Sequence, residues 1–224
     1  MIDIKRSVLW FCAVVLLAIG VSAGFVLRDC FPVKPVFAPV SSARPDNSAA
    51  WSESDNLSLL STALSVLDTL KKDDLSAFSS YIHPDYGVRF TPASTVSNTD
   101  LVFSSQDFSD AAKDSSARFI WGVSTDDNTP IRLSILDYFH TYVWDADYTA
   151  APEIGVDSVL YTGNAVENVS SASVYPENYR FLDFYIPSTN DHHPDWSALK
   201  LVFSRSTEKN RWYLIGVIHS GWTP

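Results

Sequence analysis

The apolar positions of the chain are concentrated first in one run, from Val8 to Leu27, which contains no charged residue. A helix of about 20 apolar residues spans the hydrocarbon core of a bilayer. We therefore predict a transmembrane anchor over 8–27, preceded by a cytoplasmic tail of residues 1–7. Basic residues lie on both sides of the run, so the positive-inside rule does not decide its orientation. Because the tail is very short, we expect the N-terminus in the cytoplasm and the remaining chain outside it.

A cleaved signal peptide is the alternative interpretation of the same run. Val21-Ser22-Ala23 has the small residues of a cleavage site, and Lys5 with Arg6 would form the basic region before it. However, the apolar run continues beyond this site to Leu27, which is longer than an ordinary signal peptide requires. We predict a single-pass protein of the cell membrane, and the alternative is a secreted or periplasmic protein released by cleavage.

Proline recurs four times in residues 28–53, among serines and alanines. Proline is poorly tolerated inside helices and favours the extended polyproline II conformation. This composition predicts a semi-rigid stalk that separates the anchor from the rest of the chain. The remaining residues, 54–224, are numerous enough to bury one core, so we expect one domain there.

Leucine recurs at helical spacing at the start of this domain. An amphipathic helix that ends near Lys71-Lys72 would place these residues on one face. Ser52 and Asp55 have the spacing of a capping box, in which each side chain bonds a free backbone N–H of the first turn. The residues expected to face the core are Leu57, Leu60, Leu64, Leu67 and Leu70.

Two shorter patterns predict further helices. The first covers 74–82 and is stopped by His83-Pro84. The second begins at another capping-box spacing, formed by Ser134 and Asp137. The residues expected to face the core are Leu75, Phe78 and Ile82 in the first helix, and Leu136, Phe139 and Val143 in the second.

Strands are predicted by runs of β-branched and aromatic residues, which fit a pleated, half-buried surface. Two short strands are expected over 87–91 and 118–123. A turn at 126–130 follows the second strand and separates it from the next helix. The three longest are expected over 179–186, 199–204 and 212–219. The last two are joined by a short polar segment, so they should pair as an antiparallel hairpin. The predicted class is α+β, with helices packed on one face of a curved antiparallel sheet.

Charge and cysteine content exclude some classes of function. The formal net charge is −10, and five of the 16 basic residues precede residue 51, so the domain itself is strongly acidic. An acidic surface repels phosphate backbones, and we therefore expect no nucleic-acid partner. The two cysteines, Cys12 and Cys30, both precede the domain, which must therefore fold without an internal disulfide.

Several segments of the domain carry a resemblance to a known family. These segments are Gly87-Val88-Arg89-Phe90, Ala151-Pro152-Glu153-Ile154-Gly155, Asp195-Trp196-Ser197-Ala198-Leu199, Trp212-Tyr213-Leu214 and Trp222-Thr223. The sequence resembles an uncharacterised family of exported or membrane-anchored bacterial proteins, and its layout resembles the NTF2-like (cystatin-like) superfamily. The resemblance implies helices and a curved sheet that form a cone around a pocket. It implies no activity, because a fold alone does not fix function.

Candidate catalytic residues are few. With only eight glycines, the chain has no phosphate-binding loop or dinucleotide fingerprint. Asp137 and His140 are i, i+3 neighbours on a predicted helix, where a carboxylate can orient an imidazole as a general base. The alternative is that Asp137 only caps the helix and His140 is a surface residue. His219 is a further candidate; it lies on the last strand, on the expected side of Tyr213, Ile215 and Val217, where it could equally be a core or rim residue.

Other residues are candidates for ligand binding rather than catalysis. Aromatic and acidic side chains are expected near the mouth of the implied pocket, and these candidates are Trp121, Trp144, Asp145, Asp147 and Tyr185. Ser197 and Lys200 match a Ser-x-x-Lys motif, but on a strand these positions point to opposite faces, so the motif is discarded. His192 and His193 are adjacent loop residues that would not aim at one ion, so no metal site and no cofactor are predicted.

Two functions from different classes are consistent with these observations. The first is a membrane-tethered extracytoplasmic domain, non-enzymatic, which binds an envelope small molecule or protein. The second is an NTF2-like hydrolase or isomerase that uses a His/Asp pair in the cone pocket. A pocket in which an imidazole and an aspartate meet within hydrogen-bond distance would favour the enzyme. A third possibility, a structural role, would be favoured by a broad apolar patch without a pocket.

Overall fold

The computed structural model describes residues 51–125, 127–163, 165–189 and 195–221. The predicted tail, the anchor over 8–27 and nearly all of the stalk over 28–53 lie outside the described residues. Among the helices within these described ranges, none has the length and apolarity to cross a membrane. The fold is α+β, as predicted, with a six-stranded sheet, a separate two-stranded sheet and several helices.

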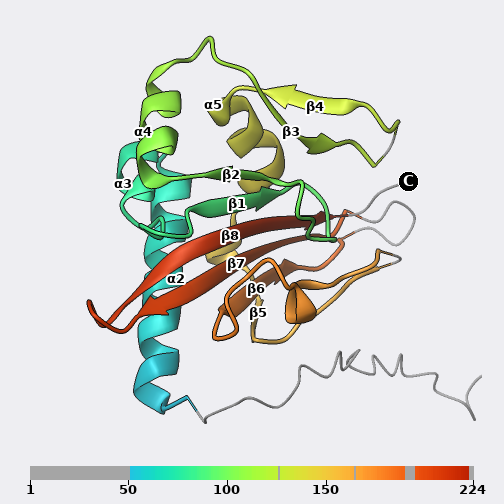
Figure 1. The fold of residues 1–224 in the computed structure, drawn as a ribbon. Helices are drawn as coiled ribbons and strands as arrows, with labels where there is room; N and C mark the ends of the chain where they lie inside the picture. Colours follow the sequence, from blue (N-terminus) through green and yellow to red (C-terminus); the bar gives the residue numbers. More distant parts are fainter. Residues whose placement is uncertain (1–50, 126, 164, 190–194, 222–224) are drawn as a thin grey trace, which may run out of the picture. The chain divides into compact units, whose positions relative to one another are not determined.

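The main sheet has the strand order β2-β1-β8-β7-β6-β5 (Figure 1). Its C-terminal part is an antiparallel meander formed by β5 (Glu153–Val156), β6 (Arg180–Ile186), β7 (Ser197–Ser206) and β8 (Arg211–Gly221). The sequence predicted its last three strands but not β5. The predicted hairpin of the last two strands is confirmed.

The prediction of an all-antiparallel sheet is wrong, because the first strand pairs in parallel with the last. β1 (Val88–Thr91) lies beside β8 in parallel register, and β2 (Leu101–Phe103) pairs with β1 antiparallel. Parallel neighbours need a long connection between them. Here the whole chain from β2 to β7 provides it, which no local pattern in the sequence could indicate.

A second, two-stranded sheet packs near the edge formed by β1 and β2. It consists of β3 (Phe119–Val123), which the sequence predicted, and β4 (Pro130–Leu133), which it did not. Asn128 adopts a positive φ of 59° in the connecting turn. Proline begins β4, where no ladder hydrogen bond from its nitrogen is required. Figure 1 shows this hairpin standing apart from the main sheet.

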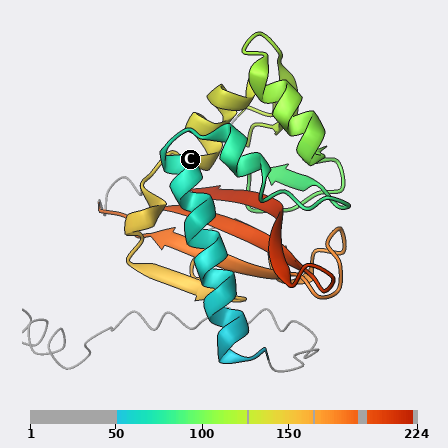
Figure 2. The same ribbon diagram turned by 90° about the vertical axis from the view of Figure 1, so that its left-hand side faces the viewer.

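The first predicted helix is α2 (Glu53–Lys71), and its capping box of Ser52 and Asp55 is present. Figure 2 shows α2 lying across the strands of the main sheet. The predicted buried face is partly confirmed, because Leu67 and Leu70 are buried, whereas Leu57 and Leu64 are 61% and 43% exposed. The core face also contains residues that were not predicted, which are Leu59, Ala63 and Val66.

The other predicted helices are also present. α3 (Leu75–Ser79) buries Phe78, as expected, and is followed by α4 (Ser105–Lys113), which the sequence did not predict. The helix expected after Ser134 begins as α5 (Ile135–Tyr138) and continues as the π-helix η1 (Phe139–Val143). Short 3-10 turns, η2 (Tyr148–Ala150) and η3 (Val169–Ser171), complete the elements.

Ser134 caps α5, but the predicted capping box is only half formed. The Ser134 hydroxyl accepts a hydrogen bond from the Asp137 backbone, while the Asp137 carboxylate bonds that hydroxyl rather than a backbone N–H. A π-helical turn contains more residues than an α-helical turn, which shifts the buried face. Phe139 and Val143 are buried as predicted, whereas Leu136 is 43% exposed.

Each face of the main sheet packs against its own apolar cluster. The larger cluster joins the helices and the hairpin to one face, and includes Phe90, Trp121, Tyr138 and Trp212. The smaller cluster, on the opposite face, includes Phe181, Ile215 and Ile218. The long segment 157–179 between β5 and β6 contributes four further members, so it covers a face that the sequence left unassigned; these members are Val169, Ala172, Tyr175 and Tyr179.

Candidate functional site

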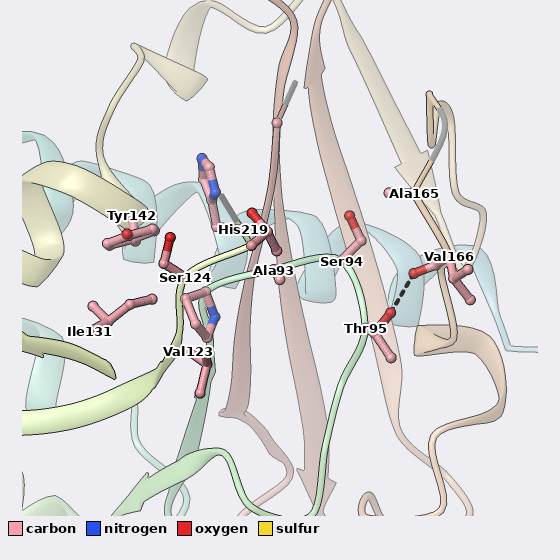
Figure 3. A pocket seen from close by; sticks show the side chains of 13 residues that line it. Ala93, Ser94, Thr95, Val123, Ser124, Ile131, Tyr142, Ala165, Val166 and His219 are labelled. Atoms are coloured by element: carbon pink, nitrogen blue, oxygen red, sulfur yellow. Dashed lines mark hydrogen bonds between the residues drawn. The ribbon is translucent and has the colours of Figure 1, made fainter. Parts of the chain in front are cut away.

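A pocket with a volume of about 400 Å³ lies where β1 and β8 end (Figure 3). Because these two strands are parallel, the loop after β1 and the last residues of β8 meet at the same end of the sheet. The wall is completed by the end of β3, by η1 and by the segment 165–166. The lining residues are Pro92, Ala93, Ser94, Thr95, Val123, Ser124, Thr125, Ile131, Tyr142, Ala165, Val166, His219 and Gly221.

The pocket lining mixes hydroxyl groups with small apolar side chains. Among the described residues that line the pocket, none is an aspartate, glutamate, lysine or arginine, although the domain as a whole is acidic. Figure 3 shows His219 and Tyr142 on the same side of the pocket, and their rings make an edge contact with centroids 6.0 Å apart. Of the described lining residues, His219 is the one whose side chain can both donate and accept a proton as a general acid or base.

His219 is held by Asp145, which comes from the loop after η1. Nε2 of His219 lies 3.1 Å from Oδ2 of Asp145, and the two side chains are 14% and 29% exposed. A carboxylate bonded to one ring nitrogen fixes the orientation of the imidazole and its tautomer. The pair thus has the geometry in which an aspartate positions a histidine as a general base.

Two further hydroxyl groups converge on Asp145. Tyr148 donates to Oδ1 at 2.6 Å, and Ser197 donates to Oδ2 at 3.0 Å. Burial would raise the pKa of Asp145, but hydrogen bonding and charge attraction from His219, with the bonds from Tyr148 and Ser197, lower it to about 2. Asp145 is therefore ionised at neutral pH, and it connects the η1 loop to β7 and β8.

The ionised form of Asp145 should contribute to stability above about pH 4. Its folded pKa of about 2 lies below the ordinary value of 3.8, so this contribution is lost as the pH falls from about 4 to about 2. A shift of this size corresponds to about 2 kcal/mol. We expect Asp145→Asn to flatten the acid limb of urea unfolding midpoints measured against pH. Asp68→Asn, at a mainly exposed carboxylate, is the matched control, and an unchanged limb in Asp145→Asn would contradict the assignment.

A β-bulge determines which way His219 points. Val202 pairs with Gly216 and Phe203 pairs with Leu214, which leaves Ile215 as an extra residue in β8. The alternation of faces changes at this residue. His219 therefore shares its side with Val217, as predicted, while Ile215 belongs to the cluster on the opposite face, which corrects the predicted grouping.

The predicted pair of Asp137 and His140 is not formed. His140 instead bonds Asp73, with Nε2 and Oδ1 2.9 Å apart, and both side chains are more than half exposed. Asp137 lies 3.8 Å from Arg118 and bonds its own cap. The π-helix explains the separation, because it changes the spacing that an α-helix would give positions i and i+3.

The remaining candidates lie in different surroundings. Trp121 is fully buried, and its Nε1 donates to the carbonyl of Leu133. Asp147 forms an ion pair with Lys71 at 2.8 Å. Trp144 contacts Tyr148, and so lies near the Asp145 cluster. Tyr185 contacts Tyr161. Neither Trp144 nor Tyr185 is among the residues that line the pocket.

The alternation of β7 separates the two residues of the Ser-x-x-Lys motif. Ser197 faces Asp145, whereas Lys200 lies buried on the opposite side of the strand. In the described part of the chain, no group of three or more histidine, cysteine, aspartate or glutamate residues could hold a metal ion. His192 and His193 lie outside the described residues.

Most of the pocket is not predicted by the sequence. His219 and Asp145 are both candidates, but the sequence does not pair them, because 74 positions separate them. Tyr142, Tyr148 and Ser197 are not among the predicted site residues, although Ser197 lies inside the discarded motif. When the chain is compared with family models, curated proteins and solved structures, none of them matches it.

Proposed function

We propose that this chain is a membrane-tethered extracytoplasmic protein whose domain binds a small polar ligand in the pocket beside His219. The observation that carries the proposal is the cavity of about 400 Å³, within the range of volumes typical of small-molecule sites. The uncharged run over 8–27 supports the tether. Helices on one face of the sheet, with a pocket at its end, support an NTF2-like arrangement.

The chemistry of the lining indicates the class of ligand. Hydroxyl groups of serine, threonine and tyrosine can both donate and accept hydrogen bonds. His219 can add a donor, and a positive charge when it is protonated. Among the described lining residues there is no acidic side chain to repel an anion. We therefore propose a neutral polyhydroxylated compound or a small carboxylate as the ligand, with Val123 and Ile131 contacting its apolar part.

Filling the pocket should abolish binding without unfolding the domain. The test is ligand-observed NMR of the full chain in detergent, with a library of monosaccharides and small carboxylic acids as probes. Ala93→Trp places an indole in the cavity, so affinities should fall by more than about tenfold. Ala150→Trp, on an exposed turn, is the matched control and should retain binding. Probes that bind Ala93→Trp as well as the wild type would refute the site.

The second candidate function is a hydrolase or isomerase, and it is favoured by the His219–Asp145 distance of 3.1 Å at the pocket wall. In this function His219 removes a proton from a ligand held in the pocket, and Asp145 stabilises the imidazolium that results. Positioned proton transfer contributes about 10²–10⁴-fold to a rate. His219→Gln distinguishes the two functions, because an enzyme would lose turnover of a bound probe while a binding domain has no turnover to lose.

A further inference from the structure

A buried lysine lies on the face of the sheet away from the pocket. Lys200 of β7 is fully buried, with Asp183 of β6 and Glu167 of the segment 157–179 beside it. Its Nζ is 3.0 Å from Oε2 of Glu167, 3.8 Å from Oδ1 of Asp183 and 2.9 Å from Oγ of Ser220. The three ionisable side chains are at most 8% exposed, so water has little access to them.

The strand register holds the amine and the Asp183 carboxyl group together. Lys200 and Asp183 are direct partners in the antiparallel ladder of β6 and β7. Directly opposed residues have their Cβ atoms about 4.5–5.5 Å apart, so the longer lysine side chain reaches the carboxyl group easily. The ladder continues on both sides of this pair, from Arg180 to Ile186, which prevents the two side chains from separating.

The hydrogen bonds leave one oxygen of each acid without a partner of good geometry. Oδ2 of Asp183 accepts from the Leu160 backbone at 2.9 Å, and Oε1 of Glu167 accepts from the backbones of Asn168 and Val169. Oδ1 of Asp183 and Oε2 of Glu167, which face Lys200, accept none. Burial raises the pKa of Asp183 above its usual range, although the charge of Lys200 opposes the shift, and this favours the neutral acid.

We propose that Lys200 and Asp183 become joined by an intramolecular amide bond, with Glu167 transferring the protons. Nζ of Lys200, after giving a proton to Glu167, attacks Cγ of Asp183 and forms the new C–N bond. The C–O bond of the protonated carboxyl group then breaks, and the hydroxyl leaves as water with the proton returned by Glu167. Glu167 then accepts the second proton of Nζ and ends as the neutral acid. The products are a secondary amide and one water molecule, so no oxidant or other reactant is required.

The closeness of the two groups and the exclusion of water from the buried site favour this condensation. Nζ lies 3.8 Å from Oδ1 of Asp183, an oxygen bonded to the Cγ atom that it attacks, so the amine is held beside the carboxyl group. Holding the groups in place replaces a bimolecular step and supplies a large effective concentration. Burial also removes the water that would otherwise drive hydrolysis. The link would connect β6 to β7 in a domain whose residues include no cysteine for a disulfide.

Intact-mass spectrometry of the purified full chain tests the proposal. We expect a mass lower than that of the sequence by one water molecule, and a proteolytic digest that contains a branched peptide joining Asp183 to Lys200. A chain with the full sequence mass would overturn the proposal. Loss of water without a branched peptide would also overturn it, since an aspartate can lose water by forming a cyclic imide with its own backbone.

Variants separate the roles of the three residues. Glu167→Gln keeps the amine and the Asp183 carboxyl group but removes the proton acceptor, so the folded variant should have the full sequence mass. Glu208→Gln, on an exposed turn, is the matched control and should lose water as the wild type does. Folding of each variant is checked by circular dichroism. Complete cross-linking in Glu167→Gln would overturn the proposed role of Glu167.

Discussion

Trp121→Ala should destabilise the domain by about 3–5 kcal/mol, since truncation of a buried tryptophan removes apolar contacts and leaves a cavity. Trp121 is fully buried and stacks on Tyr138, with ring centroids 3.8 Å apart and planes nearly parallel. Its ring also contacts Phe90 and Phe103, at 5.3 and 5.7 Å between centroids. The substitution therefore disrupts the packing of the β3–β4 hairpin against the main sheet.

Urea unfolding followed by circular dichroism would measure this loss of free energy. Ile120→Ala is the matched control, because Ile120 is the preceding residue of β3 and is 52% exposed. Surface substitutions usually change stability by less than about 0.5 kcal/mol. A Trp121→Ala variant as stable as the control would mean that Trp121 is not a core residue. In that case its predicted role in ligand binding would again have support.

Local signals in the sequence predict most of the helices and strands. Ser52 with Asp55 locates the start of α2, and the apolar pattern after Arg180 locates the C-terminal meander. These signals depend on capping hydrogen bonds and on the alternation of side chains, which involve residues only a few positions apart. They identify the buried face of α2 only in part: Leu67 and Leu70 are buried as predicted, but Leu57 and Leu64 are exposed, because apolar residues surround much of the helix and tertiary contacts select which are covered.

Long-range arrangement accounts for the features that the sequence does not predict. The parallel pairing of β1 with β8 depends on how the whole intervening chain folds back, and no residue in β1 encodes it. The segment 157–179 has few regular elements, yet it covers a face of the sheet and contributes Glu167 to a buried cluster. A glutamate in an irregular segment would ordinarily be assigned to the surface.

The candidate site is only partly accessible from the sequence for the same reason. The Asp137–His140 hypothesis assumes α-helical spacing, and the π-helix at Phe139 invalidates it. The pair of Asp145 and His219 forms between a loop and the last strand, and the bulge at Ile215 sets the direction of the histidine. Sequence spacing describes neither feature. The residue types are informative, but the pairing requires the fold.

The second large expected effect on stability comes from Lys200, which is buried on the face of the sheet covered by the segment 157–179. Lys200→Met should destabilise the domain by about 3–5 kcal/mol, because it removes both the proposed amide link and the partner of Glu167, and leaves a buried carboxylate uncompensated. Methionine keeps most of the apolar volume of the lysine side chain. The charge left behind is chiefly that of Glu167, whose side chain is 8% exposed and lies 3.0 Å from the amine in the wild type.

A second substitution isolates this electrostatic cost from any covalent link. Neither Lys200→Met nor Lys200→Met with Glu167→Gln can form an amide at position 200, so the difference between them reports the buried carboxylate alone. We expect the double variant to be more stable than the single variant by about 1–3 kcal/mol, since glutamine carries no charge to desolvate. The comparison is made by urea unfolding at neutral pH. Equal stability of the two variants would show that Glu167 is neutral once Lys200 is removed, which would contradict the uncompensated charge assigned to it.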